Sequence, residues 1–239
     1  MEIEDTDVLV TGSAVRVGRA MALRLAEEGA NVAVHYRTSE EEAKDTADDV
    51  RERGGAATTV QSDLSTVEGA RAAVDGAADG LGGIDVLVNS ASVFNETPVE
   101  DVTEEDWNTN IDINLRAPFF TSQRATERGA KKVINIAGVA AERPFPSFVP
   151  YSVSKAGVVS LTKGLAKALA PEVTVNAVSP GTVLSPPDRP EEEERRIAED
   201  TPVKRVGEPG DIADTVAFVV RSSDFLNGAV IDVDGGRSL

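Results

Sequence analysis

Short apolar runs alternate with longer amphipathic segments along the whole chain, and this alternation is the feature that most constrains the fold. The apolar runs, rich in valine, alanine and isoleucine, are residues 7–10, 31–36, 57–62, 85–90, 132–137, 173–178 and 229–233. Such runs are typical of strands buried on both faces of a parallel sheet. The segments between them, for example 18–29, 39–54 and 107–128, have helical spacing. The pattern predicts an α/β fold: a doubly wound sheet of about seven parallel strands with helices on both faces.

No linker rich in proline, glycine or serine interrupts this alternation. Residues 1–239 are therefore expected to form one domain. The one long irregular segment, residues 181–209, has the length of a lid over an active site.

Charge and residue usage narrow the classes of function. The chain has 24 basic and 41 acidic residues, a net charge of −17, which disfavours nucleic acid and anionic membranes as partners. No apolar run approaches the roughly 20 residues of a membrane span, and acidic residues follow Met1, so we expect a soluble, cytoplasmic protein. Without cysteine, and with His35 as the only histidine, we expect neither disulfide chemistry nor a zinc site.

The acidic excess allows two interpretations. It can be an ordinary soluble surface, or a halophile-like surface suited to high internal salt, where salt screens the repulsion between like charges. The low lysine count, seven against seventeen arginines, favours the second interpretation.

The stretch VTGSAVRVG, residues 10–18, follows the first predicted strand and opens a helix. In α/β folds this is where backbone N–H groups meet phosphate, so we expect a nucleotide site. Gly12 permits a tight turn and Gly18 a close helix approach, whereas Arg16 occupies a place that such loops often give to glycine.

The end of the second strand suggests which dinucleotide is bound. A cofactor without a 2′-phosphate usually has its ribose held by an acidic residue there, but this chain has Tyr36, flanked by His35, Arg37, Thr38 and Ser39. Together with Arg16, these donors can form a pocket for a 2′-phosphate, which predicts NADPH rather than NADH. The alternative is that His35 and Arg37 are simply part of a surface loop.

The next two strand ends are also candidates for cofactor contacts. Asp63 can accept a hydrogen bond from an adenine amino group, or it can cap the following helix. Asn89 can hydrogen-bond to a neighbouring loop, and the small residues after it allow a cofactor to lie against the backbone.

Tyr151 and Lys155 lie four residues apart in YSVSK, at a predicted helix start, so their side chains project to one face. A free tyrosine has a pKa of about 10 and exchanges protons poorly at neutral pH. A nearby ammonium group stabilises phenolate, so we expect Lys155 to lower the pKa of Tyr151 and make it a general acid.

These motifs together resemble those of the short-chain dehydrogenase/reductase family over nearly the full length of the chain. The matches are TGSAVRVG, Asp63-Leu64, NSAS at 89–92, Asn114 in DINLRAPFF, YSVSK, SPG at 179–181 and the terminal VDGG. The resemblance implies a single Rossmann-type domain, hydride transfer between NAD(P)(H) and a carbonyl group, and a homotetramer. It implies that Tyr151 is the general acid, that Lys155 lowers its pKa and binds ribose, and that Asn114 holds a water in the proton relay. The expected cofactor residues are Gly12, Arg16, Val17, Gly18, His35, Tyr36, Arg37, Thr38, Ser39, Asp63, Leu64, Asn89, Ser90, Ala91, Tyr151, Lys155, Pro180 and Gly181.

The usual catalytic serine of the family lies thirteen residues before the tyrosine, and that position is Gly138 here. Loss of a donor to a developing oxyanion costs roughly 2.7 to 4 kcal/mol if nothing replaces it. Either Ser92 or Ser147 replaces the hydroxyl, or the substrate does not need it, or the protein is a weak enzyme.

One branch of the family, the pteridine reductases, also lacks this serine. The present chain resembles it in VTGSAVRVGRA, in HYRTS, and in Ser92 and Phe94 of NSASVFNETP. The resemblance implies that Phe94 stacks on a pterin, although that branch commonly has an aspartate where this chain has Gly138. Alternatively, Phe94 is an apolar residue that packs under the lid.

Three hypotheses follow. The favoured one is NADPH-dependent reduction of a C=O or C=N group, with a pterin as substrate. The second is reduction of a 3-oxoacyl thioester or a sugar carbonyl. The third is a catalytically weak NADP-binding module.

Overall fold

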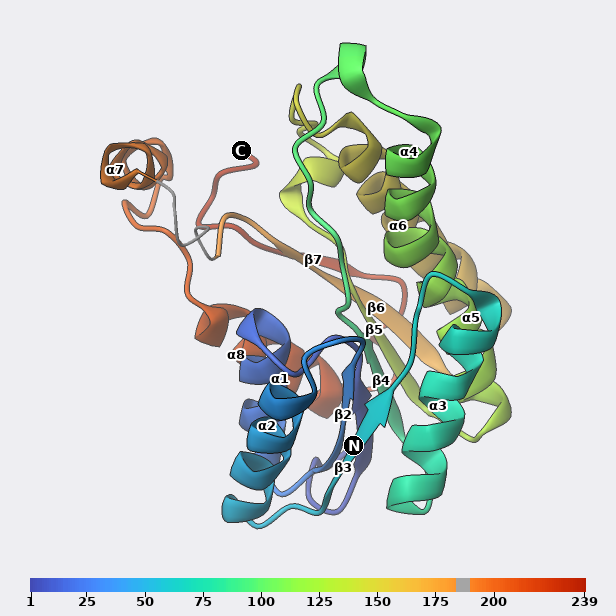
Figure 1. Ribbon diagram of the computed structural model, residues 1–239. Helices are drawn as coiled ribbons and strands as arrows, with labels where there is room; N and C mark the ends of the chain where they lie inside the picture. The colour runs from blue at the N-terminus through green and yellow to red at the C-terminus, as the bar shows by residue number, and fades with distance from the viewer. Residues whose placement is uncertain (184–189) are drawn as a thin grey trace.

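Seven parallel strands form one sheet in the computed structural model, which describes residues 1–183 and 190–239 (Figure 1). The strand order is β3-β2-β1-β4-β5-β6-β7, and every neighbouring pair is parallel. The strands are β1 (Asp7–Val10), β2 (Asn31–Tyr36), β3 (Ala57–Gln61), β4 (Val86–Asn89), β5 (Lys132–Ile136), β6 (Thr174–Pro180) and β7 (Val230–Val233). Each strand falls within or beside an apolar run of the sequence, so the predicted doubly wound sheet is confirmed.

Helices cover both faces of this sheet (Figure 1). One face carries α1 (Arg16–Ala26), α2 (Glu40–Glu52) and α8 (Pro209–Arg221). The other carries α3 (Val67–Leu81), α4 (Glu104–Ile111), α5 (Ala117–Glu127) and α6 (Val149–Ala168). Two short 3-10 turns, η1 (Val99–Asp101) and η3 (Val139–Ala141), lie in the loops after β4 and β5.

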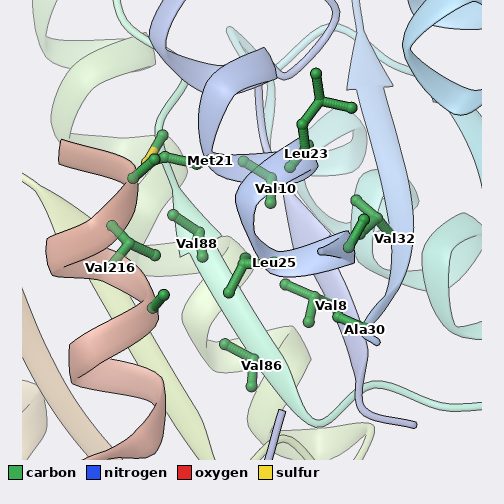
Figure 2. Close-up of a cluster of buried hydrophobic side chains, with 14 of the residues drawn as sticks. Val8, Val10, Met21, Leu23, Leu25, Ala30, Val32, Val86, Val88 and Val216 are labelled. Carbon is green, nitrogen blue, oxygen red and sulfur yellow. The ribbon is translucent and has the colours of Figure 1, made fainter. Parts of the chain in front are cut away.

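The core consists of an apolar layer on each side of the sheet, because alternate residues of a strand point to opposite faces. Val8 and Val10 pack against α1 and α8, whereas Leu9 between them packs on the other side with α3 and α5 residues. The cluster around α1 and α8 is shown in Figure 2. Small and branched residues let the helices approach the sheet closely.

The segment 107–128, expected as one helix, is interrupted in the middle. A π-helical turn, η2 (Asp112–Arg116), separates α4 from α5. Pro118 has no N–H to donate to the carbonyl of Asn114, four residues earlier, so the regular α-helical ladder is broken here. The Ala117 N–H bonds instead to the carbonyl of Asp112.

The expected lid, residues 181–209, contains α7 (Glu191–Asp200), which lies apart from the helices packed on the sheet (Figure 1). Residues 184–189 of that segment lie outside the described part of the chain. None of the helices in the described part is long and apolar enough to cross a membrane.

β1 lies between β2 and β4, so the chain reverses its direction of winding at the β1/β4 pair. In open α/β sheets, ligands bind at the carboxyl ends of the strands at such a switch point. The loops after β1 and β4 are therefore expected to form a ligand-binding site.

Candidate active site

A cavity of about 940 Å³ lies along the carboxyl ends of the strands. The loops that follow β1 to β6 line it, with Gly12 and Arg37 near one end and Tyr151 and Phe148 near the other. The cavity therefore joins the predicted nucleotide residues to the predicted proton donor.

The turn after β1, residues 11–18, is called the glycine turn below. Gly12 has φ +66°, and a Cβ added to it would lie 2.9 Å from the Ala91 Cα. A Cβ on Gly18 would lie 2.2 Å from the Gly12 carbonyl oxygen, so neither position accepts a side chain. Arg16 and Val17 also line the cavity, and Arg16 has φ +56°, a conformation that costs a residue with a Cβ roughly 1–2 kcal/mol.

His35 lies beneath the glycine turn and is 2% exposed. Its Nδ1 accepts a hydrogen bond from the Gly12 N–H at 3.0 Å, and its Nε2 lies 3.0 Å from the Ser62 Oγ. Because both ring nitrogens are already engaged within the protein, the expectation that His35 donates to a 2′-phosphate needs correction.

The other residues of HYRTS point in different directions. Tyr36 packs in the hydrophobic core and does not line the cavity, because its ring is on the buried face of β2. Thr38 and Ser39 are also absent from the cavity wall, and Ser39 precedes α2. Arg37 is exposed and does line it. Of the expected phosphate pocket, Arg16, His35 and Arg37 line the cavity, and of these only the two arginines are exposed.

Asp63 and Leu64 line the cavity after β3. The Ser65 N–H donates to the Asp63 Oδ1 at 2.9 Å and lowers the pKa of this carboxyl group. Asp63 therefore closes a turn just before α3, whose N-cap is Thr66. The second Asp63 oxygen can still accept a hydrogen bond from a ligand.

Asn89 is 5% exposed and does not line the cavity, which corrects its expected place among the cofactor contacts. Its Nδ2 donates to the Asn135 Oδ1 at 2.9 Å, and its Oδ1 accepts from the Thr121 Oγ1 at 2.7 Å. The adjacent residues Ser90 and Ala91 do line the cavity. Their N–H groups donate to the Thr11 Oγ1, which ties the end of β4 to the glycine turn.

Tyr151 and Lys155 both face the cavity from the first turns of α6. The Lys155 Nζ lies 5.5 Å from the centroid of the Tyr151 ring and donates to the Ile136 carbonyl at 2.9 Å. This bond uses one of the three ammonium donors, so two are left for other partners.

Burial shifts both of these groups toward their neutral forms. It raises the pKa of Tyr151 to about 12 and lowers the pKa of Lys155 to about 8. The expected lowering of the Tyr151 pKa by Lys155 is therefore not found in the chain alone, because the loss of solvent outweighs the nearby charge. At neutral pH Tyr151 keeps its proton and Lys155 remains mainly charged.

Asn114 lies in the π-helical turn and is 1% exposed. Its Oδ1 accepts from the Val93 N–H at 2.8 Å and the Ser92 Oγ at 3.0 Å. Its Nδ2 donates to the Ser154 Oγ at 3.1 Å. The side chain thus links the loop after β4 to α6 and positions Phe94 and Tyr151 relative to each other.

Gly138, Pro180 and Gly181 line the cavity beside Tyr151. A Cβ added to Gly138 would lie 3.4 Å from the Tyr151 hydroxyl oxygen, an ordinary contact distance. There is space for a serine here, so the missing hydroxyl is not excluded by packing. Ser92 and Ser147 both line the cavity. Because the Ser92 hydroxyl donates to Asn114, Ser147 stays the candidate replacement donor.

Phe94 forms part of an aromatic group in the cavity wall. Its ring stacks on that of Phe148 with centroids 4.3 Å apart, and it meets Tyr151 edge to face at 4.7 Å. Phe145 meets Phe148 edge to face, with ring centroids 6.3 Å apart. Phe94 is still 47% exposed, so part of its ring is open to a ligand.

Sequence reasoning missed Phe145 and Phe148, which have no helical or strand periodicity and lie in a stretch interrupted by prolines. Their position just before Tyr151 in RPFPSFVPY was the only signal available. It also missed Thr182, Ile197 and Arg237, which line the cavity from the β6 end, α7 and the final residues of the chain.

Comparison with known proteins agrees with this geometry. The profile of a family described as enoyl-(acyl carrier protein) reductase matches residues 12–238. The 3β-hydroxysteroid dehydrogenase 1 of Eggerthella lenta is 36% identical over 100% of this chain and 95% of its own. A 3-oxoacyl-[acyl-carrier-protein] reductase of Staphylococcus aureus is 34% identical over 95% of this chain and 96% of its own. The crystal structure of a short chain dehydrogenase from Burkholderia cenocepacia in complex with NADP has a TM-score of 0.94 and 31% identity, and each chain is covered fully. The present chain therefore belongs to the short-chain dehydrogenase/reductase family of oxidoreductases.

Proposed function

We propose that this protein is an NADPH-dependent reductase that transfers hydride to a C=O or C=N group in a small, flat, ring-containing substrate. One observation carries the proposal: Tyr151 and Lys155 face the same cavity as the glycine turn and Arg37. A proton donor and a dinucleotide site must share one cavity for this reaction.

The residues present fit a phosphorylated dinucleotide. Gly12 and Gly18 form a cradle that a Cβ would fill, and the cavity continues from there to Tyr151. Two exposed arginines, Arg16 and Arg37, lie at the glycine-turn end, and no carboxylate ends β2. The NADP bound to the Burkholderia cenocepacia relative supports the same cofactor here. NADPH held in this cavity supplies the hydride.

Tyr151 acts as the general acid. Because the pKa of this hydroxyl is about 12, it is protonated at neutral pH and can donate a hydrogen bond to the substrate oxygen or nitrogen. As negative charge develops on that atom, the proton moves from Tyr151 to it. The Lys155 ammonium group, 5.5 Å from the ring centroid, stabilises the tyrosinate that is left.

The proton lost from Tyr151 has to be replaced, and Asn114 contributes through its main chain. The side-chain amide of Asn114 is committed to Val93, Ser92 and Ser154. The main-chain carbonyl of Asn114 would normally accept from the N–H of residue 118, but Pro118 has no N–H. We assign the water-holding role to this carbonyl rather than to the amide.

Phe94 supports a flat substrate. Phe148 covers one face of its ring, and the exposed part lies in the cavity near Tyr151. A planar ring can stack there at low cost in conformational entropy. The name of the Eggerthella lenta relative supports a fused-ring ketone as substrate.

A pterin is the second candidate substrate, favoured by Phe94 together with Gly138. Reduction of a ring C=N bond does not develop an oxyanion, so the donor that Gly138 lacks is less necessary. The name of the Staphylococcus aureus relative favours a 3-oxoacyl thioester instead. The weak binding module is the least supported hypothesis, because Tyr151 and Lys155 both face the cavity.

The test is NADPH oxidation by the purified protein in high-salt buffer. A 3-oxosteroid, dihydrobiopterin, dihydrofolate and acetoacetyl-CoA are offered in parallel, and Tyr151→Phe serves as the control. Turnover of a ring substrate that falls roughly 10² to 10⁴-fold in Tyr151→Phe supports the proposal. Turnover of the thioester alone contradicts the ring class. Tight NADPH binding without turnover of any substrate supports the binding module.

A further inference from the structure

We propose that His35 is a positioning residue for the glycine turn, supporting NADPH and NADH equally, and not a ligand of the 2′-phosphate. This inference rests on the proposed function, because it assumes that the glycine turn holds a dinucleotide. It assigns to the single histidine of the chain a role different from that of Arg37, two residues later.

Three hydrogen bonds join His35 to two successive residues of the turn. The Gly12 N–H donates to the imidazole Nδ1 at 3.0 Å. The Ser13 N–H donates to the His35 carbonyl at 3.0 Å, and the His35 N–H donates to the Ser13 Oγ at 3.2 Å. The side chain and the main chain of one β2 residue therefore hold the turn together.

The direction of these bonds fixes the tautomer. Nδ1 accepts from a backbone N–H and so carries no proton, which leaves the proton on Nε2. Nε2–H then donates to the Ser62 Oγ, 3.0 Å away, beside Asp63 at the end of β3. Burial lowers the pKa of His35 to about 4 and outweighs the nearby Asp63 carboxylate, which raises it, so the ring is neutral at physiological pH.

The turn has little freedom on its other side. A Cβ on Gly12 would lie 2.9 Å from the Ala91 Cα, and Gly18 packs against the Gly12 carbonyl. The imidazole is the only side chain that the described residues place as an acceptor for the Gly12 N–H. An apolar replacement would leave this N–H unpaired, and the turn would relax away from Ala91. Such a movement changes the part of the site that both dinucleotides share.

Three substitutions separate the two ring contacts. In His35→Asn, the amide oxygen occupies about the place of Nδ1 and can accept from Gly12. In His35→Gln, the amide reaches about the place of Nε2 and can bond only to Ser62. His35→Leu keeps the bulk and loses both contacts.

The dissociation constants of NADPH and NADH are measured by fluorescence titration for each variant, with thermal unfolding to verify folding. We expect His35→Asn to stay within about threefold of the wild type. We expect His35→Gln and His35→Leu to weaken both dinucleotides by the same factor, about tenfold. A loss confined to NADPH would make His35 a 2′-phosphate ligand, and unchanged binding in folded His35→Leu would remove its role.

A measurement without cofactor tests the contact itself. Because His35 is the only histidine, ¹⁵N-labelled histidine gives one pair of ring signals. We expect an unprotonated Nδ1, a protonated Nε2 and no titration between pH 6 and 8. Protonated Nδ1, or titration near the free value of about 6.5, would overturn the inference. If the tautomer is as expected and the wild type binds neither dinucleotide, the proposed function fails while the hydrogen bond stands.

Discussion

Lys155 and Tyr151 are two ionisable groups at a buried site, and their burial lowers the stability of the folded state. Burial lowers the pKa of Lys155 and raises that of Tyr151, so it disfavours the charged form of each. Lys155 is 3% exposed, yet it is mainly charged at pH 7. The site therefore keeps a buried charge that a structural core would avoid.

Replacement of Lys155 by methionine tests this cost through its pH dependence. The folded-state pKa of Lys155 is about 8 against an ordinary value of 10.5, so the unfolded chain binds more protons between these values. The stability of the wild type relative to Lys155→Met should thus rise by about 3 kcal/mol from pH 8 to pH 10.5. Denaturant unfolding of both proteins at several pH values measures this difference in the free energy of unfolding. Lys163→Met, which removes an exposed lysine of the same helix, is the matched control.

Arg16 and Arg37 should determine the choice between dinucleotides. Removal of both guanidinium groups deletes charge-assisted bonds to a 2′-phosphate, each worth about 1.5–3 kcal/mol. We expect the double variant Arg16→Ala/Arg37→Ala to weaken NADPH at least about tenfold more than NADH. Titration with both cofactors measures the ratio, and Arg51→Ala on α2 is the surface control. Equal losses would contradict the 2′-phosphate pocket.

Gly138 allows a direct test of the missing hydroxyl. The added Cβ meets the Tyr151 oxygen at 3.4 Å, so a side chain fits. If the donor limits ketone reduction, Gly138→Ser should raise kcat on a simple ketone about tenfold or more, whereas Gly138→Ala should not. Steady-state kinetics of the pair separate the hydroxyl from the Cβ. Equal rates for both variants would point to Ser147 or to a substrate that needs no second donor.

At the scale of the elements, a row of buried amides connects β4 and β5 to the helices behind them. Asn89 on β4 is paired in register with Asn135 on β5, and their side chains are hydrogen-bonded. Thr121 of α5 and Thr162 of α6 extend the row at its two ends. This row holds α6, which carries Tyr151, at a fixed place relative to the sheet.

Asn89→Leu should destabilise the fold by about 1–3 kcal/mol, because the Asn135 Oδ1 has no other partner among the described residues. The double variant Asn89→Leu/Asn135→Leu removes both polar groups and should cost less than the sum of the single changes. Chemical denaturation of the four proteins measures the coupling. Strictly additive losses would show that the two amides act independently.

The sheet was predictable from the sequence because each buried strand is a continuous apolar run. The interruption at Asn114 was not, since the apolar spacing of residues 107–128 continues through it and only Pro118 marks it. In the site too, local sequence patterns were predictable, and contacts between distant segments were not. YSVSK and the two glycines are local patterns, whereas the burial of His35 under Gly12 depends on how β1 and β2 pair.

At the scale of the whole molecule, the net charge of −17 sets how the fold responds to salt. Repulsion between like charges disfavours the compact state, and it weakens as the screening length falls from about 10 Å at 0.1 M to about 3 Å at 1 M. We expect the melting temperature to rise by several degrees between 0.1 and 2 M KCl. Differential scanning fluorimetry measures the melting temperature at each KCl concentration. Sucrose serves as the control solute that carries no charge. A flat response to KCl would favour an ordinary soluble surface.

The amino terminus lies at the amino ends of the strands and the carboxyl terminus at their carboxyl ends. This difference decides where an affinity tag can be placed. Arg237 lines the cavity and donates to the Thr182 Oγ1, and Arg143 donates to the Leu239 carbonyl. Met1 to Thr6 precede β1, so they lie at the amino ends of the strands, whereas the cavity lies at the carboxyl ends. An affinity tag fused after Leu239 would begin two residues after Arg237 of the cavity wall, so we expect it to interfere with substrate binding. None of residues 1–6 lines the cavity, so the amino-terminal fusion is the form in which to screen substrates.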